Sequence, residues 1–260
     1  MYRKRFEDVE ERLRRLENGE RSSKLMFSMG YVLLVAILSA AIASMSTYYV
    51  STKTKTKTTS SLPHRGSDLM LNLGSGSKRL PGYVNVDKSD MFDPDIVWDL
   101  ETFPWPFRND SVSKILMSHV LEHVGSDPNL FLRIIQELHR ICRNGAIIHV
   151  IVPHPYHSDF IADPTHVRAV SFDLLLKFSK RSNRDWIAKS KADTPFALLL
   201  DVDFDFKNFS LVLDHYYVGM AIERDILTLK EANNLTLVYE LSKIHGNLVK
   251  QISMDMIVRK

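Results

Sequence analysis

The chain has 260 residues, of which 45% are apolar and 25% are charged, so it can form one α/β domain with additional elements and has a globular composition. Its net charge of +3 is small and its basic residues gather near the N-terminus, which argues against nucleic acid as a partner. Cys142 is the only cysteine, which excludes an intramolecular disulfide and a cysteine-based zinc cluster.

The first 24 residues are rich in charge and carry one apolar stripe. Phe6, Val9, Leu13 and Leu16 recur at spacings of three and four, which places them on one side of a helix. We expect an amphipathic helix over residues 1–24, beside the membrane segment that follows it. Two interpretations stay open: the stripe pairs with a second copy to form a homo-oligomer, or the helix is solvated and has no specific partner.

Residues 25–50 form a long, mostly apolar stretch. No charged residue occurs between Leu25 and Thr52, and roughly 20 apolar residues are enough for a helix to cross a bilayer core. Tyr48 and Tyr49 end the stretch, where aromatic side chains favour the interface. The sequence therefore predicts a single transmembrane helix whose partner is the lipid bilayer. Residues 51–67 alternate lysine with threonine and then run into Ser, Pro and Gly, which predicts a flexible linker.

From residue 68 onward, short apolar runs alternate with helical patterns. The runs predict buried strands at 69–73, 83–86, 96–98, 115–117 and 146–152. Before the last of these, Asp127 as N-cap, Pro128 in the first turn, and a stop at Asn144 and Gly145 predict a helix. We expect another helix over 171–180 and strands at 235–241 and 251–258. This alternation predicts an α/β fold with an open, doubly wound, mostly parallel sheet over residues 68–260.

Residues 182–217 combine aromatic side chains, such as Trp186, with the carboxylates Asp201, Asp203 and Asp205. We expect this segment to form a cap over a site at the edge of the sheet. The other interpretation is that its aromatic side chains pack in the core. Alternating carboxylates at this spacing are more typical of one polar face of a strand than of a cation site.

Four predicted strands end on glycine or polar residues that share one crevice, because ligands bind beyond the carboxyl ends of strands in such sheets. In chain order these residues are Gly74, Ser75 and Gly76, then Asp87, then Asp99 and Leu100, and finally Ser118 and His119. A strand-terminal carboxylate is well placed for ribose hydroxyls. A dinucleotide is disfavoured, because Arg79 stands at the third glycine position and Asp87 comes too early.

Three stretches are similar to a known family: LNLGSG at 71–76, VNVD at 84–87 and DIVWDLETFPWPFRNDSVSKILMSHVLEHV at 95–124. They resemble the class I S-adenosylmethionine-dependent methyltransferases, in particular the group called methyltransferase type 11. The resemblance covers residues 68 to about 178. It implies a Rossmann-like methyltransferase fold with S-adenosyl-L-methionine as cofactor.

The resemblance also implies a role for each matching residue. The cofactor's methionine lies against Gly74, Ser75 and Gly76, and its ribose is held by Asp87. Its adenine lies near Asp99 and Leu100, and His119 lines the methionine or sulfonium side. Asn72 stands where an acidic residue is commoner in the family, so its contact to the cofactor's amino group, direct or through water, is expected to be weak.

The first crossover is shorter than the family pattern. Only ten residues separate Gly76 from Asp87, and they include Pro81 and Gly82. A crossover helix with its loops needs about a dozen residues or more. We therefore expect the first helix to be reduced to a turn.

Histidines occur in two places near the predicted site. The run from His119 to His123 matches H-x-x-E-H, a zinc-peptidase signature on a helix, but here it follows a strand directly, so we expect no metal.

After the fifth strand, His154, His157 and His166 crowd one loop, where a histidine could remove the proton from an acceptor hydroxyl or amine. The other interpretation is that these side chains only cap turns. A metal site built from His154, His157 and Asp159 is not required by their spacing.

These observations predict a membrane-tethered S-adenosylmethionine-dependent methyltransferase that acts on a small-molecule, lipid or glycan acceptor. The alternative is a non-catalytic membrane adaptor that keeps the fold. The side of the membrane stays open: the excess of basic residues before the span favours a cytosolic N-terminus, whereas a cofactor made in the cytosol favours a cytosolic domain.

Overall fold

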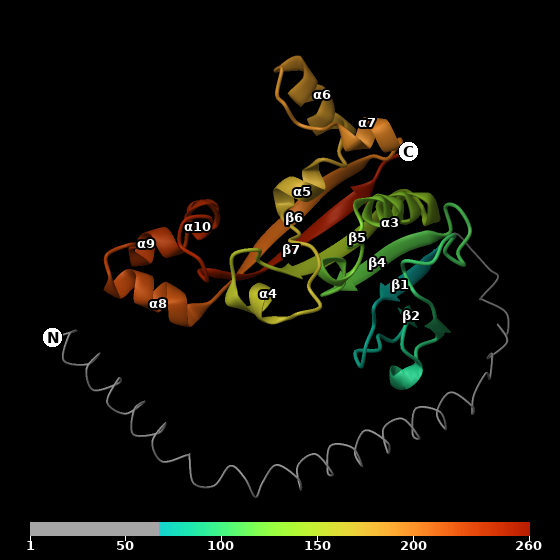
Figure 1. Ribbon diagram of the computed structural model, residues 1–260, viewed down its shortest axis with the longest axis horizontal. Coiled ribbons are helices and arrows are strands. Elements are labelled where there is room, and N and C mark those ends of the chain that lie inside the picture. Colours follow the sequence, from blue (N-terminus) through green and yellow to red (C-terminus); the bar gives the residue numbers. More distant parts are fainter. Residues whose placement is uncertain (1–67) are drawn as a thin grey trace, which may run out of the picture. The chain divides into compact units, whose positions relative to one another are not determined.

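The computed structural model describes residues 68–260, which form one seven-stranded sheet with helices (Figure 1). The strands are β1 (Leu69–Leu73), β2 (Val84–Asp87), β3 (Ile96–Val97), β4 (Val112–Ser118), β5 (Cys142–Pro153), β6 (Phe204–Leu213) and β7 (Val249–Val258). They lie in the order β3-β2-β1-β4-β5-β7-β6. Strands β1 to β5 pair in parallel, whereas β7 is antiparallel to both β5 and β6. Because the order of the first five strands is that of Rossmann sheets, the predicted mostly parallel, Rossmann-like sheet is confirmed.

The predicted amphipathic helix at 1–24, membrane helix at 25–50 and linker at 51–67 lie outside the described residues. Within residues 68–260, no helix combines the length and the apolar character that crossing a bilayer requires. The tether therefore stays a prediction from the sequence.

The crossover between β1 and β2 contains no helix, as its length predicted. Residues 74–83 instead form turns that are held by backbone hydrogen bonds, from Lys78 N to Ser75 O at 2.9 Å and from Tyr83 N to Leu80 O at 3.2 Å. The predicted reduction of the first helix to a turn is confirmed.

Helix α3 (Pro128–Ile141) connects β4 to β5. Asp127 caps it, because its carboxylate accepts hydrogen bonds from Asn129 N at 2.7 Å and Leu130 N at 3.3 Å. The helix buries one apolar stripe, made of Phe131, Ile134, Ile135, Leu138 and Ile141. It ends where Cys142 becomes extended and begins β5. The predicted stop at Asn144 and Gly145 is therefore wrong, since both residues lie within that strand.

The region after β5 contains four short helices: α4 (Ser158–Ala162), α5 (Phe172–Leu176), α6 (Lys180–Ala188) and α7 (Phe196–Leu200). The single helix predicted over 171–180 is interrupted, because Ser171 caps α5 and Ser179 caps α6 with their hydroxyl groups. Residues 204–213, inside the segment predicted as a cap, instead form β6 at the edge of the sheet.

Helices α8 (His215–Glu223), α9 (Leu229–Ala232) and α10 (Leu235–Ser242) lie between β6 and β7. The strand predicted at 235–241 is wrong, since these residues form α10. Asn234 caps that helix by accepting a hydrogen bond from Leu237 N at 3.2 Å. A small second core joins these helices to the start of β7 through Val218, Val238 and Val249.

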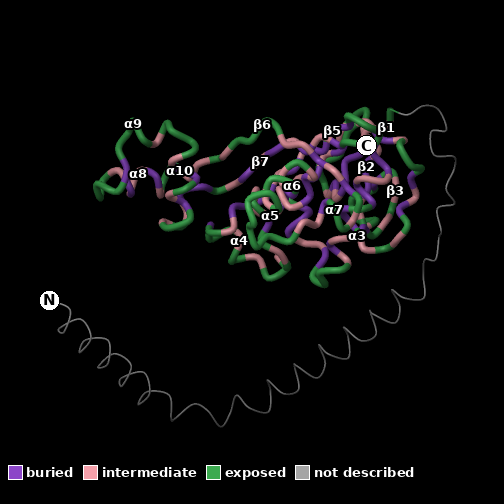
Figure 2. The backbone as a smooth tube through the Cα atoms, turned by 90° about the horizontal axis from the view of Figure 1, so that it is seen from above, coloured by how far each residue is buried: buried purple, intermediate pink, exposed green. Residues whose placement is uncertain are grey.

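Helices α3, α5 and α7 cover one face of the sheet. Figure 2 shows α3, α5 and α7 on the same side of the strands. On β5, Ile148, Val150 and Val152 are fully buried, whereas the alternate residues Ile147 and His149 are not. Parallel sheets are normally covered on both faces. Within residues 68–260, only one half of the predicted double winding is therefore present.

Candidate active site

A cavity of about 400 Å³ lies beyond the carboxyl ends of β1 to β4. Five of the eight residues predicted to bind a cofactor line it: Gly74, Asp87, Asp99, Leu100 and His119. They come from four different strand ends, as the sequence predicted. The sheet topology thus brings these residues together around one volume.

The glycine turn holds its backbone close to the next layer of the structure. Gly74 has a positive φ of +64°, and a Cβ atom there would lie 2.5 Å from Cγ2 of Val120. Only glycine fits such a position without strain. Two residues on, Gly76 N donates a hydrogen bond to Oδ2 of Asp87 at 2.8 Å, which ties the turn to the end of β2.

Asp87 has capacity for further hydrogen bonds. Its Oδ2 accepts from Gly76 N, and its Oδ1 accepts from Ser89 N at 2.9 Å. Each carboxylate oxygen has a second lone pair. Because the side chain also lines the cavity, it can accept hydrogen bonds from two hydroxyl groups of a ligand.

The segment after β3 supplies an apolar wall with a polar edge. Trp98 and Leu100 line the cavity, and the Trp98 ring is fixed because its indole N–H donates to Thr102 O at 3.1 Å. Asp99 Oδ1 accepts from Glu101 N at 2.9 Å, which keeps this carboxylate at the rim. An apolar surface beside a carboxylate suits a planar, hydrogen-bonding base.

Three predicted cofactor residues do not line the cavity. Asn72 is buried, and its Nδ2 donates to Lys78 O at 2.9 Å and to Asn85 Oδ1 at 3.0 Å. Gly76 contributes its N–H to Asp87 as described above. Ser75 is also buried, and its Oγ has no hydrogen-bond partner among residues 68–260. An orphaned hydroxyl in this turn fits a polar ligand group close by.

Seven further residues line the cavity and were not predicted as cofactor-binding residues: Lys88, Trp98, Glu101, Val120, His123, Val124 and Thr165. Several of them are neighbours of predicted residues, so their position after a strand end was the available signal. Thr165 carried no such signal, because it reaches the cavity from the distant loop after α4.

A second cavity of about 280 Å³ adjoins the first. It is lined by His119, His123, Pro153, Asp159, Asp163, His166, Lys250 and Gln251. His119 and His123 line both cavities and therefore form their boundary. Lys250 and Gln251 belong to β7, so this volume lies on the far side of β4 from the glycine turn.

His119 is held at this boundary in an unusual conformation. Its φ of +57° lies in the left-handed region, which is strained for a residue with a side chain. Nε2 lies 3.1 Å from Oε1 of Gln251, and Nδ1 lies 3.2 Å from Oε1 of Glu122. The Glu122 carboxylate raises the pKa of the His119 imidazole, although partial burial opposes this. Because each ring nitrogen faces an oxygen atom, the doubly protonated, positively charged form of the ring is favoured.

Of the three histidines predicted as bases, only His166 lines a cavity. Its Nδ1 lies 2.7 Å from Phe160 O, and its ring stacks on that of Phe160. A carbonyl oxygen only accepts, so Nδ1 carries the hydrogen and Nε2 presents a lone pair. His166 is therefore placed to accept a proton.

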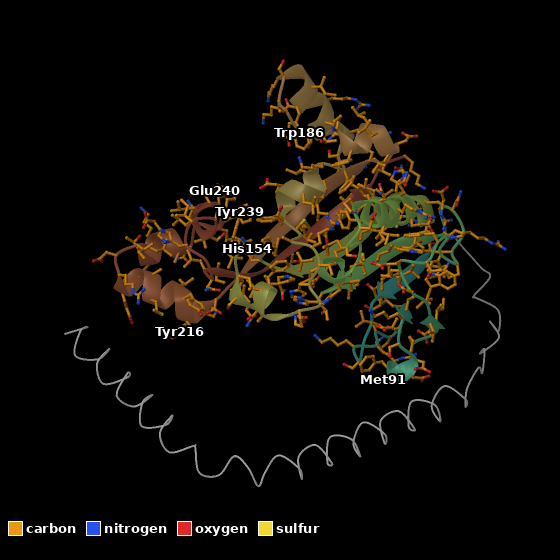
Figure 3. All side chains as sticks on the ribbon, viewed as in Figure 1. Met91, His154, Trp186, Tyr216, Tyr239 and Glu240 are labelled. Carbon is orange, nitrogen blue, oxygen red and sulfur yellow. The ribbon has the colours of Figure 1, made fainter. Side chains whose placement is uncertain are left out.

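His154 and His157 are buried within the structure. The Nε2 atom of His154 lies 3.1 Å from Ser242 Oγ, and Figure 3 shows this side chain beside Tyr239 of α10. His157 caps α4 by accepting from Asp159 N at 3.1 Å, and its Nε2 lies 3.3 Å from Oδ2 of Asp214. Both rings are thus engaged in packing and hydrogen bonds, as the turn-capping interpretation predicted.

No protein-family model matches the chain, and no curated protein matches it. Several solved structures resemble it. Phosphoethanolamine N-methyltransferase 2 of Haemonchus contortus, in complex with S-adenosyl-L-methionine, shares 10% identity with a TM-score of 0.44, over 76% of this chain and 50% of its own. A SAM dependent methyltransferase from Archaeoglobus fulgidus shares 16% identity with a TM-score of 0.45, over 73% of this chain and 86% of its own. The [4+2]-cyclase SpnF shares 12% identity with a TM-score of 0.41, over 75% of this chain and 77% of its own.

This chain spans half the length of the Haemonchus contortus protein that it resembles. The three proteins are named for two kinds of reaction, so the resemblance leaves the reaction of this chain open. For residues 68–260, the order and direction of strands β1 to β5 are those of a Rossmann-like sheet.

Proposed function

We propose that the chain is an S-adenosylmethionine-dependent methyltransferase. The observation that supports this most is the pair of adjoining cavities, one at the glycine turn and one beyond His119 and His123. The larger would hold the cofactor and the smaller the acceptor. The bound cofactor would supply an activated methyl group on a sulfonium sulfur.

On the cofactor side, each residue has a role that its contacts support. Asp87 would accept hydrogen bonds from the ribose hydroxyls, while Gly76 N and Ser89 N hold its carboxylate in place. Gly74 lets the backbone approach the methionine part, and Ser75 Oγ is available to its polar groups. Trp98 and Leu100 would pack against the adenine, and Asp99 would accept a hydrogen bond from its amino group; all three residues line the larger cavity.

On the acceptor side, the residues orient the attacking atom and exclude water. Positioning of this kind supplies most of the rate in a displacement that needs little covalent assistance. His166 Nε2 is placed to take the proton that an acceptor hydroxyl or amine loses as it is methylated. Lys250 and Asp159, whose charged atoms lie 3.3 Å apart, border the same volume and offer both signs of charge to a polar acceptor.

We further propose that residues 25–50 tether the domain to a membrane. A tethered enzyme meets acceptors that are themselves in or on the bilayer, so a lipid, a glycan or a membrane-linked small molecule is the acceptor class that we favour. The proposed span is supported by its length and its lack of charge.

Calorimetric titration of S-adenosylmethionine into the full-length chain tests cofactor binding. We expect micromolar affinity, and we expect Asp87→Ala to weaken it by about 100-fold, because a charged acceptor of two or more hydrogen bonds is lost. Asp90→Ala is the matched control, since Asp90 is an exposed carboxylate three residues away. A folded wild-type chain that releases no heat would overturn the proposal.

The second candidate is a non-catalytic membrane adaptor that retains the fold. It is favoured by one observation: at a position where the family commonly has an acidic residue, Asn72 uses its amide N–H groups to hold Asn85 and the loop after the glycine turn. A radiolabelled-methyl assay on membranes distinguishes the two. Labelling of a membrane component supports the enzyme, whereas cofactor binding without transfer supports the adaptor. Protease protection on the same membranes reports the side that carries the domain.

A further inference from the structure

Three side chains at the boundary of the two cavities converge on one point. Glu122, His123 and His166 each offer a ligand atom, and these atoms lie within 4.8 Å of one another. Glu122 and His123 belong to the short 3₁₀ turn Leu121–His123 that follows β4, and His166 belongs to the loop after α4. Val167 N donates to Glu122 O at 2.8 Å, and this backbone bond joins the turn to the loop.

The Glu122 carboxylate lacks the partners that a buried charge needs. Its side chain is 0% exposed, and neither oxygen accepts a well-directed hydrogen bond from residues 68–260. His119 Nδ1 lies 3.2 Å from Oε1 and can offset part of the charge. Buried carboxylates are normally paired, hydrogen-bonded or bound to a metal. The lack of a partner at Oε2 of Glu122 therefore indicates that this oxygen binds a further ligand.

Both histidines make a hydrogen bond through Nδ1, as metal-binding histidines commonly do with the nitrogen that does not bind the metal. His166 Nδ1 lies 2.7 Å from Phe160 O, which leaves its Nε2 as a lone pair. His123 Nδ1 lies 2.9 Å from Thr165 Oγ1 and 3.3 Å from Thr165 O. The Thr165 hydroxyl donates its own hydrogen to Asp163 Oδ1 at 2.6 Å, so it must accept from His123. Each ring is thus oriented by an acceptor at Nδ1, which fixes the tautomer with Nε2 free.

We propose that Glu122, His123 and His166 bind a divalent transition-metal ion of the Zn²⁺ or Fe²⁺ type. Two imidazoles with one carboxylate form a ligand set that suits these ions and leaves at least one coordination position for water or substrate. On a tetrahedral ion with bonds of about 2.1 Å, ligand atoms lie about 3.4 Å apart, so small side-chain rotations close the site. The sequence pattern H-x-x-E-H did not predict this set, because His119 is replaced by His166 from a distant loop.

The ion would border the volume in which the acceptor lies. His123 lines both cavities and His166 lines the smaller one. With the ion bound, His166 Nε2 would be a ligand and could not take the proton of the acceptor. A hydroxyl group bound to the ion would instead lose its proton to water at a lower pH, which would leave an oxygen nucleophile. The site therefore favours an acceptor that is methylated on oxygen. This last step rests on the proposed function, whereas metal binding does not.

Cobalt titration of the full-length chain, after removal of bound metal with a chelator, tests the site directly. We expect visible Co²⁺ absorption bands that saturate at one equivalent and disappear when Zn²⁺ is added. His123→Ala and His166→Ala should each weaken binding at least about 100-fold. His215→Ala, an exposed histidine of α8, is the matched control and should have no effect. Glu122→Gln tests the carboxylate, and the two histidine variants decide the outcome if it fails to fold.

The absence of bands in the folded wild-type chain, or equal affinity in both histidine variants and the control, would overturn the site. Calorimetry with S-adenosylmethionine on the same samples separates this from the proposed function. Cobalt binding without cofactor binding keeps the metal site and removes the methyl-transfer role, whereas cofactor binding without cobalt binding does the opposite.

Discussion

Asn72 Nδ2 donates a hydrogen bond to Oδ1 of Asn85 at 3.0 Å, which joins β1 to β2 in the buried layer beneath the glycine turn. Asn85 also accepts from Leu80 N at 2.8 Å and donates to Asp95 at 2.9 Å. Burial opposes ionisation of Asp95, but hydrogen bonds from Asn85 and the Arg79 charge hold the pKa of that carboxyl below its usual value. Side-chain hydrogen bonds of Asn72 and Asn85 therefore hold the loop at residues 74–83, where a longer crossover would have a helix.

We predict that Asn85→Ala destabilises the chain by about 2–3 kcal/mol, because it leaves one N–H of the buried Asn72 amide and the partly buried N–H of Leu80 without partners. It should also weaken cofactor binding, since the turn that positions Gly76 against Asp87 loosens. Chemical denaturation and cofactor titration measure the two effects. Asn129→Ala, an exposed asparagine in the first turn of α3, is the control. Equal stability of the two variants would contradict the role given to Asn85.

Gly74→Ala should cost about 2 kcal/mol or more, because its Cβ would lie 2.5 Å from Val120 Cγ2 at a positive φ. Gly76→Ala is the matched comparison: its φ is also positive, at +48°, but no atom lies within 4 Å of a Cβ there. Adding Val120→Ala to Gly74→Ala should restore the part of the free energy of unfolding that is lost through the clash with Val120. A double-mutant cycle measures this part. If the two alanine variants are equally destabilised, backbone strain alone accounts for the effect.

His154 should make stability depend on pH. Burial, with the nearby charges of His157 and Lys243, lowers the pKa of His154 to about 4. The unfolded chain takes up this proton below about pH 6.5 and the folded chain does not, so stability is full at neutral pH and falls as pH drops from about 6.5 toward 4. The expected loss between pH 7.5 and 5 is about 2 kcal/mol.

Urea unfolding of His154→Phe at both pH values checks this, because phenylalanine keeps the ring beside Tyr239 and removes the titrating group. Between pH 7.5 and 5, the free energy of unfolding of the variant should fall by about 2 kcal/mol less than that of the wild type. The exposed-site variant His215→Phe should behave like the wild type. An unchanged pH dependence in His154→Phe would show that other groups cause it.

Substitutions of two loop histidines, His157 and His166, should have different effects. His166→Gln should lower methyl transfer by about 100-fold with little change in cofactor affinity, because the ring faces the smaller cavity. His157→Gln should instead lower stability, because the bonds to Asp159 N and Asp214 are lost. Methyl-transfer assays on membranes, run beside thermal denaturation, distinguish the two. Loss of activity in His157→Gln at full stability would reverse this assignment.

Strand ends were predictable from the sequence because they combine two strong signals. Apolar runs located β1, β2 and β3, and the residues at the end of each run had to meet at one edge of a parallel sheet. Gly74, Asp87 and Asp99 were found in this way without any knowledge of side-chain contacts. The reduced first crossover was also predictable, since chain length alone limits what ten residues can form.

Burial of the loop histidines was not predictable. His154 and His166 look equivalent in sequence, but the first packs against α10, whose residues 235–241 have an apolar pattern that also fits a strand. The N-cap at Asn234 was the missed signal. Likewise, β6 was not predicted as a strand of the sheet: of the carboxylates Asp201, Asp203 and Asp205, only Asp205 lies within it, at the sheet edge beside β7. The loop that carries His166 is joined to Glu122 by tertiary bonds from Val167 N and Arg168 N to Glu122 O, which the sequence does not reveal.

The helix-free crossover after β1 also determines which charges the larger cavity attracts. A helix that begins at a glycine turn carries about half a positive charge at its N-terminus and draws phosphate groups to it. Residues 74–83 form turns and provide no such terminus. The cavity is lined instead by the carboxylates of Asp87, Asp99 and Glu101 against the single ammonium of Lys88. Its electrostatic preference is therefore for a ligand that carries positive charge, such as a sulfonium, and against a nucleotide polyphosphate.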